Sequence, residues 1–131
     1  MTTYIWKLEF GANREWHLHT VFIFDGQRVL RDGYLSMKIG DYWSDVITHR
    51  MGSYHSCNLT RNQYAFDGIG MVDYRDADKI DALKHSALNY LAKEDEQRAE
   101  FFDAGGKLVR SFGMAQYQPK QVVGGRPRLY V

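Results

Sequence analysis

The strongest constraint on the fold is the alternation of side chains in the first 24 residues. Residues 4–10 place one set of side chains on one face of an extended chain, Tyr4, Trp6, Leu8 and Phe10, and a second set on the other face, Ile5, Lys7 and Glu9. Residues 16–24 alternate in the same way, with Trp16, Leu18, Phe22 and Phe24 opposite His17, His19, Val21 and Ile23. Residues 11–15 between the runs are turn-like. The two runs therefore predict an antiparallel hairpin.

The rest of the chain predicts two helices and further strands. The stretch 33–47 has apolar residues at helical spacing: Leu35, Ile39, Trp43, Val46 and Ile47. Asp76 or Asp78 can cap a second helix that runs to about Lys93, with the apolar stripe Ile80, Leu83, Ala87, Leu88 and Leu91. We expect strands over 68–74 and 108–112, and a polar loop over 50–67 with a short strand near Tyr54. These elements predict an α+β fold, an antiparallel sheet flanked by helices.

Length and charge favour one domain followed by a tail. The chain has 131 residues, of which 44% are hydrophobic, enough to bury one core. We expect a single domain over residues 1–117 and a basic tail over 118–131, because residues 107–131 carry five basic and no acidic side chains. No apolar run exceeds the four residues 21–24, and Cys57 is the single cysteine. We therefore expect a soluble protein with no signal peptide, membrane segment or internal disulfide.

The predicted hairpin places three possible metal ligands together. His17 and His19 share a face of their strand, with rings roughly 6 to 7 Å apart. If the hairpin closes symmetrically, Glu9 lies opposite His17 and Lys7 lies opposite His19. Glu9, His17 and His19 can then hold a divalent ion, for which manganese or magnesium is the expected cofactor. The alternative is an ordinary polar cross-strand pair on the solvated side of a hairpin.

The second helix carries a possible nucleophile. Tyr90 and Lys93 are three residues apart, so on a helix they share a face. A tyrosine that attacks a phosphodiester needs its developing charge stabilised, and a nearby ammonium group and a metal ion on the phosphate both do so. The alternative is that Tyr90 borders the apolar stripe and Lys93 is a solvated charge. Taken with the histidine pair, the catalytic interpretation is favoured.

Several separate motifs resemble those of a known family. They are residues 4–11, His17-Leu18-His19, residues 39–43, residues 68–71, Tyr90-Leu91-Ala92-Lys93, and, near the C-terminus, residues 110–113 and 125–128. Together they resemble the HUH (His-hydrophobic-His) rolling-circle endonucleases, and more narrowly the inovirus gene-2-type replication proteins and their prophage relatives. The resemblance implies metal-dependent nicking of single-stranded DNA through a 5′-phosphotyrosine intermediate, with a free 3′-hydroxyl, in the cytoplasm of a bacterial host cell.

The resemblance also leaves a second function open. Members of that family carry a further strand upstream of the hairpin, whereas this chain starts at Met1, three residues before Tyr4. We therefore expect an exposed sheet edge that pairs with a second copy or a larger partner. The alternative function is an inactive nucleic-acid- or protein-binding module, such as a regulator or an inhibitor of a host defence system. Expected contacts to single-stranded DNA are Arg50, Tyr54, Arg61, Lys120, Arg126 and Arg128.

Overall fold

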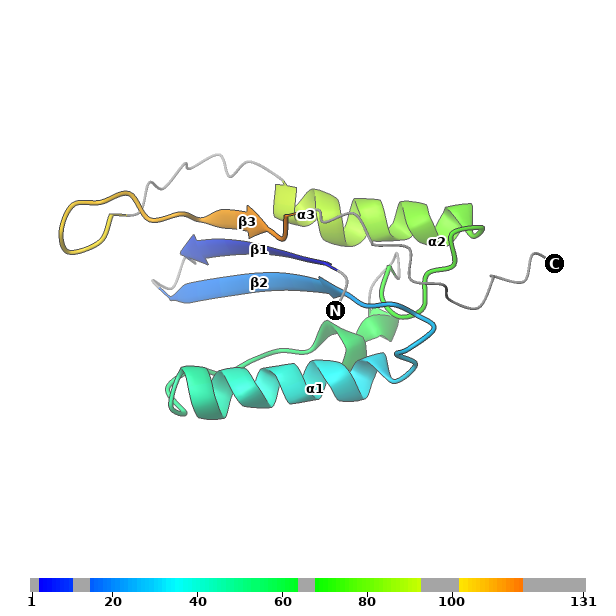
Figure 1. The fold of residues 1–131 in the computed structure, drawn as a ribbon, viewed down its shortest axis with the longest axis horizontal. Coiled ribbons are helices and arrows are strands. Elements are labelled where there is room, and N and C mark those ends of the chain that lie inside the picture. The colour runs from blue at the N-terminus through cyan, green and yellow to red at the C-terminus, as the bar shows by residue number, and fades with distance from the viewer. Residues whose placement is uncertain (1–2, 11–14, 64–67, 93–101, 117–131) are drawn as a thin grey trace.

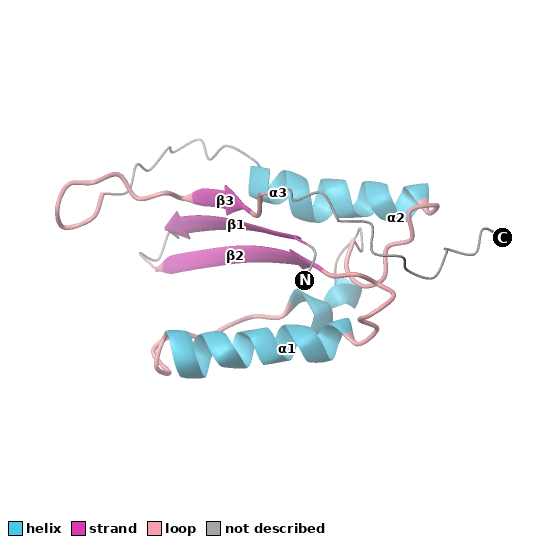
Figure 2. Ribbon diagram, in the orientation of Figure 1, coloured by secondary structure: helices cyan, strands magenta, loops and turns pink. Residues whose placement is uncertain are grey.

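A three-stranded antiparallel sheet lies between two helical layers (Figures 1 and 2). The computed structural model describes residues 3–10, 15–63, 68–92 and 102–116. The strands are β1 (Thr3–Phe10), β2 (Trp16–Ile23) and β3 (Phe112–Met114), in the order β2-β1-β3. On one side lies α1 (Asp32–Tyr42), and on the other a helix made of α2 (Ala77–Ala82), η4 (Leu83–Leu88) and α3 (Asn89–Ala92). The predicted α+β class is confirmed.

The hairpin has the predicted register. Lys7 lies opposite His19 and Glu9 lies opposite His17, so the alternating faces of the two strands coincide. At the turn end, the rings of Phe10 and Trp16 pack edge to face with centroids 5.0 Å apart. The polar set of the sequence alternation therefore shares one surface of the sheet.

The third strand completes the sheet on the other side of β1. It lies a few residues later than the predicted strand over 108–112, because Leu108 instead forms an isolated bridge with Phe102. Gly113 is paired with Trp6, and a Cβ at this glycine would lie only 2.5 Å from Nε1 of that indole. The glycine thus allows β3 to approach β1 closely beneath a large ring. Among the described residues, the outer sides of β2 and β3 form the sheet edges.

Both predicted helices are confirmed. The first runs through α1 and continues as the π-helical turn η1 (Trp43–Ile47). The second begins at Ala77, where the carboxylate of Asp76 accepts a hydrogen bond from the backbone N–H of Lys79 at 3.0 Å. The side chains of its predicted apolar stripe are partly or fully buried, and Leu91 is only 4% exposed. Helical spacing therefore located both helices, but Val46 and Ile47 at the end of the first helix are 49% and 55% exposed.

The strands predicted over 68–74 and near Tyr54 are wrong. Residues 68–74 form a loop in which the carbonyl oxygen of Ile69 accepts hydrogen bonds from Nζ of Lys79 at 2.6 Å and from Nη2 of Arg61 at 3.2 Å. These side chains satisfy an acceptor that a strand would offer to its neighbour. Gly70, with φ of 90°, turns the chain away from an extended path. Around Tyr54 the described chain is loop, followed by the short turns η2 (Cys57–Leu59) and η3 (Arg61–Gln63).

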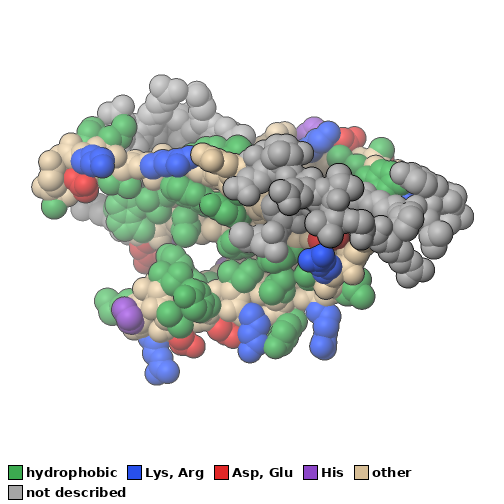
Figure 3. Space-filling view, viewed as in Figure 1, with side chains coloured by type: hydrophobic (Ala, Val, Ile, Leu, Met, Phe, Trp, Pro, Cys, Tyr) green, Lys and Arg blue, Asp and Glu red, His purple; other side chains and the backbone are tan. Residues whose placement is uncertain are grey.

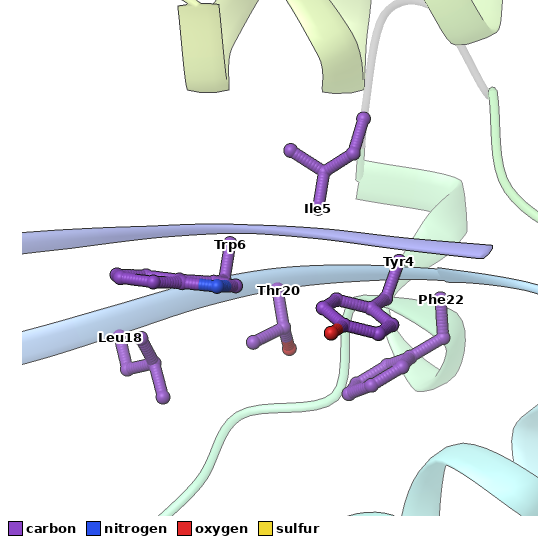
Figure 4. A pocket seen from close by; sticks show the side chains of 6 residues that line it. All are labelled: Tyr4, Ile5, Trp6, Leu18, Thr20 and Phe22. Carbon is purple, nitrogen blue, oxygen red and sulfur yellow. The ribbon is translucent and has the colours of Figure 1, made fainter. Parts of the chain in front are cut away.

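The aromatic face of the hairpin turns toward α1. Figure 4 shows Tyr4, Trp6, Leu18, Thr20 and Phe22 pointing to that side, while Ile5 points to the opposite one. The five side chains and Ile5 line a cavity of about 380 Å³. Figure 3 shows hydrophobic side chains on both sides of the hollow between the sheet and α1. Because side chains alternate along β1, Lys7 and Glu9 lie on the Ile5 side, away from this hollow.

Candidate functional site

The polar face of the hairpin holds a three-residue network centred on Glu9. Its Oε1 lies 2.7 Å from Nζ of Lys7, and its Oε2 lies 2.9 Å from Nε2 of His19. The three residues are neighbours because Lys7 and Glu9 are two apart on β1, and His19 is the cross-strand partner of Lys7 on β2. The network is shielded from solvent, with the side chains of Lys7, Glu9 and His19 only 10%, 20% and 32% exposed. Strand alternation and hairpin register together build it.

The charges in this network hold Glu9 in its ionised form. Burial raises the pKa of Glu9, but the hydrogen bond from Lys7 and the positive charges of His19 and Lys7 outweigh that effect. The net result is a pKa below the ordinary value of 4.5. At neutral pH the site therefore presents a carboxylate, the form that a cation requires.

His17 stands at the edge of the network. Its ring centroid lies 6.3 Å from that of His19, which agrees with the spacing expected for alternate residues on a strand. Its Nε2 lies 3.9 Å from Oε2 of Glu15, and its side chain is 51% exposed. The structure thus brings Glu9 and His19 into contact and leaves His17 beside them, turned toward Glu15.

The carboxylate and imidazole groups of this cluster are suitable ligands for a divalent ion, but only two of the three proposed ligands, Glu9 and His19, are in contact. Two atoms bound to one metal ion at about 2.1 to 2.3 Å lie roughly 3 Å apart, close to the 2.9 Å between Glu9 Oε2 and His19 Nε2. Among the described residues, no group of three His, Cys, Asp or Glu side chains is already gathered as a metal site. A rotation of the exposed His17 side chain is what a third ligand from this face requires.

The helix with the candidate nucleophile packs on the same side of the sheet. Its last segment, α3, lies against β1 (Figure 1), and Tyr90 belongs to this segment. Leu91, in the same segment, is almost fully buried. The structure therefore places the backbone of Tyr90 on the helix that covers the face bearing Lys7 and Glu9. Lys93, its proposed helper, lies outside the described residues.

The predicted nucleic-acid contacts lie elsewhere. The hydroxyl of Tyr54 donates to Oδ1 of Asp41 on α1 at 3.0 Å, which raises the pKa of this phenol above its usual value of 10.0. Arg50 follows η1, has an 85% exposed side chain and lies 3.5 Å from Asp45. Arg61 is held by the carbonyl of Ile69. Tyr54 and Arg50 thus belong to the α1 layer, on the far side of the sheet from Glu9. Lys120, Arg126 and Arg128 lie outside the described residues.

Lys7 is the site residue that sequence reasoning missed. The alternation places it on the histidine face and the register places it opposite His19, but the sequence alone predicts only a cross-strand neighbour. Its 8% exposure is the new observation, because lysine is seldom buried unless it is paired. A lysine two residues from a carboxylate on a central strand is the signal that could have identified it.

Comparisons with known proteins identify a family. No curated protein and no solved structure matched the chain. A family model described as the YagK/YfjJ C-terminal domain matches residues 1–115, which include every described strand and helix. Within the described residues, no helix is long and apolar enough to cross a membrane. The match covers most of the chain, and the protein therefore belongs to the YagK/YfjJ C-terminal domain family.

Proposed function

We propose that this protein nicks single-stranded DNA, with Tyr90 as the nucleophile and Glu9, His17 and His19 as ligands of a manganese or magnesium ion. The observation that carries the proposal is the contact of 2.9 Å between Glu9 and His19 on the face against which α3 packs. The resemblance of the separate motifs to HUH endonucleases supports the same assignment. On this proposal the protein acts on replicating DNA in the cytoplasm of a bacterial host cell.

The chemistry assigns one task to each side chain. The phenolic oxygen of Tyr90 attacks the scissile phosphorus, and the bond from phosphorus to the 3′-oxygen breaks. The phenol loses a proton and the departing 3′-oxygen gains one, which leaves a 5′-phosphotyrosine and a free 3′-hydroxyl. Lys93 stabilises the negative charge near the tyrosine oxygen. Glu9, His17 and His19 would hold the divalent ion, which would supply Lewis-acid polarisation of the phosphate.

The direct test looks for the covalent intermediate. The full chain is incubated with labelled circular single-stranded DNA and manganese, and denaturing electrophoresis detects a protein–DNA adduct. Tyr90→Phe should bind DNA as well as the wild type does and form no adduct. Tyr74→Phe, which alters an exposed tyrosine before α2, is the matched control and should form the adduct normally. An adduct of undiminished yield in Tyr90→Phe, or none in the wild type with either metal, contradicts the proposal.

One observation favours a second candidate, a module that binds DNA or protein without cutting. Both carboxylate oxygens of Glu9 already have partners within the chain, Lys7 and His19, as in a cluster with a structural role. The same experiment separates the two functions. A binding module retains the labelled strand on a native gel, gives no adduct under denaturing conditions, and is not stabilised by manganese.

The partners follow from the same proposal. Single-stranded DNA is the substrate, and Arg50, Tyr54, Arg61 and the basic residues of 118–131 are its proposed contacts outside the cutting site. Arg50 and Tyr54 lie in the α1 layer. A DNA strand that contacts both Arg50 and Glu9 therefore has to pass around an edge of the sheet. The outer edge of β2 is the proposed site for pairing with a second copy or a larger partner.

A further inference from the structure

Lys7 is held as a buried cation at the centre of the sheet. It lies on β1 between two paired strands, opposite His19 on one side and Phe112 on the other. The residue is 8% exposed, and its ammonium group reaches Oε1 of Glu9 at 2.7 Å. A buried ammonium needs a counter-charge, because an unpaired charge away from water is strongly unfavourable. The carboxylate of Glu9 supplies that charge.

A metal ion that uses Glu9 meets this ammonium group. Lysine at neutral pH donates hydrogen bonds and offers no lone pair, so Lys7 cannot be a ligand beside Glu9. Instead it shares the same carboxylate, one oxygen of which faces Lys7 while the other faces His19. Two positive charges a few ångströms apart repel each other, and partial burial strengthens that repulsion. Binding of a divalent ion therefore has a cost that depends on the charge of Lys7.

We propose that Lys7 sets the divalent-cation affinity of the Glu9–His19 pair by acting as a built-in competing cation. The inference rests on the proposed function, since it takes Glu9 and His19 as metal ligands. It adds a role for Lys7: the ammonium orients the carboxylate of Glu9 through their 2.7 Å contact, and it also makes metal binding weaker and more readily reversible. A purely structural lysine has the opposite consequence, because its loss loosens the carboxylate and weakens metal binding.

Neutral and charged replacements separate these roles. Lys7→Met keeps the length and apolar stem of the side chain and removes the charge, and Lys7→Arg keeps the charge as the matched control. Manganese binding to each full-length chain is measured from the electron paramagnetic resonance signal of the free ion, with circular dichroism to check folding. Lys7→Met should bind manganese roughly tenfold more tightly than the wild type, the scale of one partly screened charge. Lys7→Arg should stay within about threefold of the wild type.

Equal or weaker binding by a folded Lys7→Met overturns the inference. A measurement on the wild type covers the case in which that variant does not fold: the ¹⁵N resonance of the Lys7 ammonium should shift during a magnesium titration, with the same midpoint as the His19 ring. An unmoved ammonium resonance while the ring titrates also overturns it.

The outcomes distinguish this inference from the proposed function. Tighter binding by Lys7→Met without any tyrosine–DNA adduct supports the role of Lys7 and rejects nicking. Equal binding by wild type and Lys7→Met, with an adduct, rejects the role of Lys7 and leaves nicking in place. An absence of manganese binding in both chains, with no movement of either resonance, rejects both.

Discussion

Nε2 of His19 lies 2.9 Å from Oε2 of Glu9, and the two strands that carry them are paired antiparallel. Lys7 completes the arrangement from the position opposite His19. A carboxylate between an ammonium group and an imidazole is stable in its ionised form. The loss of either partner destabilises the folded protein. The first prediction tests both properties.

Replacement of Glu9 by Gln should destabilise the protein in a pH-dependent way. The pKa of Glu9 is lower in the folded chain than its ordinary value of 4.5, so its ionised form stabilises the fold above about that pH. This stabilisation is lost as the pH falls through the lowered pKa. At pH 7 the variant should lose about 1–3 kcal/mol, because the ammonium of Lys7 is left without its carboxylate. Urea denaturation between pH 3 and pH 7 measures the difference, which should shrink toward acid pH.

Glu15→Gln is the matched control for this prediction. The side chain of Glu15 is 74% exposed and lies 3.9 Å from His17, so its loss should change stability little at any pH. A Glu9→Gln variant that is equally destabilised at pH 3 and pH 7 would contradict the role assigned to the ionised carboxylate.

The double variant His17→Ala/His19→Ala should lose stabilisation by manganese. A ligand that binds only the folded chain stabilises it by roughly 2.7 kcal/mol at 100 times its Kd. Thermal melts with and without manganese should therefore separate for the wild type and coincide for the double variant. His85→Ala, on the exposed side of η4, is the control and should keep the shift. A shift that survives in the double variant places the metal elsewhere.

Much of the candidate site could be predicted from the sequence because strands have a strict period of two. Once the two alternating runs are paired symmetrically about the segment between them, the partners of His17 and His19 follow without further information. Helical spacing likewise located α1 and the helix that ends in α3. These are local patterns, and local patterns are visible in one sequence.

What could not be predicted depends on contacts between distant residues. The loop at 68–74 has the composition of a strand, but Lys79 and Arg61 take the carbonyl of Ile69 from outside the segment. The position of β3 depends on the fit of Gly113 beneath the ring of Trp6. The burial of Lys7 depends on its position on the central strand, which is paired with β2 on one side and β3 on the other. None of these contacts produces a periodic pattern of residue types in the sequence.

Leu91→Ala should destabilise the fold by about 2–4 kcal/mol, because it leaves a cavity at the most deeply buried hydrophobic side chain of the described residues, in the segment that packs on β1. Leu30→Ala, at a side chain 77% exposed, is the control and should change stability by less than about 0.5 kcal/mol. Urea denaturation measures both variants. Equal effects of the two substitutions would show that α3 does not anchor on the sheet through Leu91.

The outer edge of β2 should pair with another chain. An unpaired strand edge offers backbone donors and acceptors that a second strand can satisfy. Light scattering over a range of protein concentrations should therefore show a dimer, or a larger partner should be recovered with the protein from cells. A strict monomer at high concentration, with no partner recovered, contradicts this prediction.

Deletion of residues 118–131 should weaken the salt dependence of DNA binding. The segment contains Lys120, Arg126 and Arg128, and no acidic residue follows Asp103. Each contact between a basic side chain and a phosphate of single-stranded DNA releases counterions, which contributes about 0.7 to the slope of log affinity against log salt. If all three side chains contact phosphates, the slope should flatten by roughly 2 when the segment is removed. Fluorescence anisotropy with a labelled single strand, measured at several salt concentrations, gives both slopes.

A full-length variant with Lys120, Arg126 and Arg128 replaced by Gln keeps the chain length and should flatten the slope equally. An unchanged slope in both variants would assign these charges to a protein partner, and it would leave the roles proposed for Tyr90 and Glu9 unaffected.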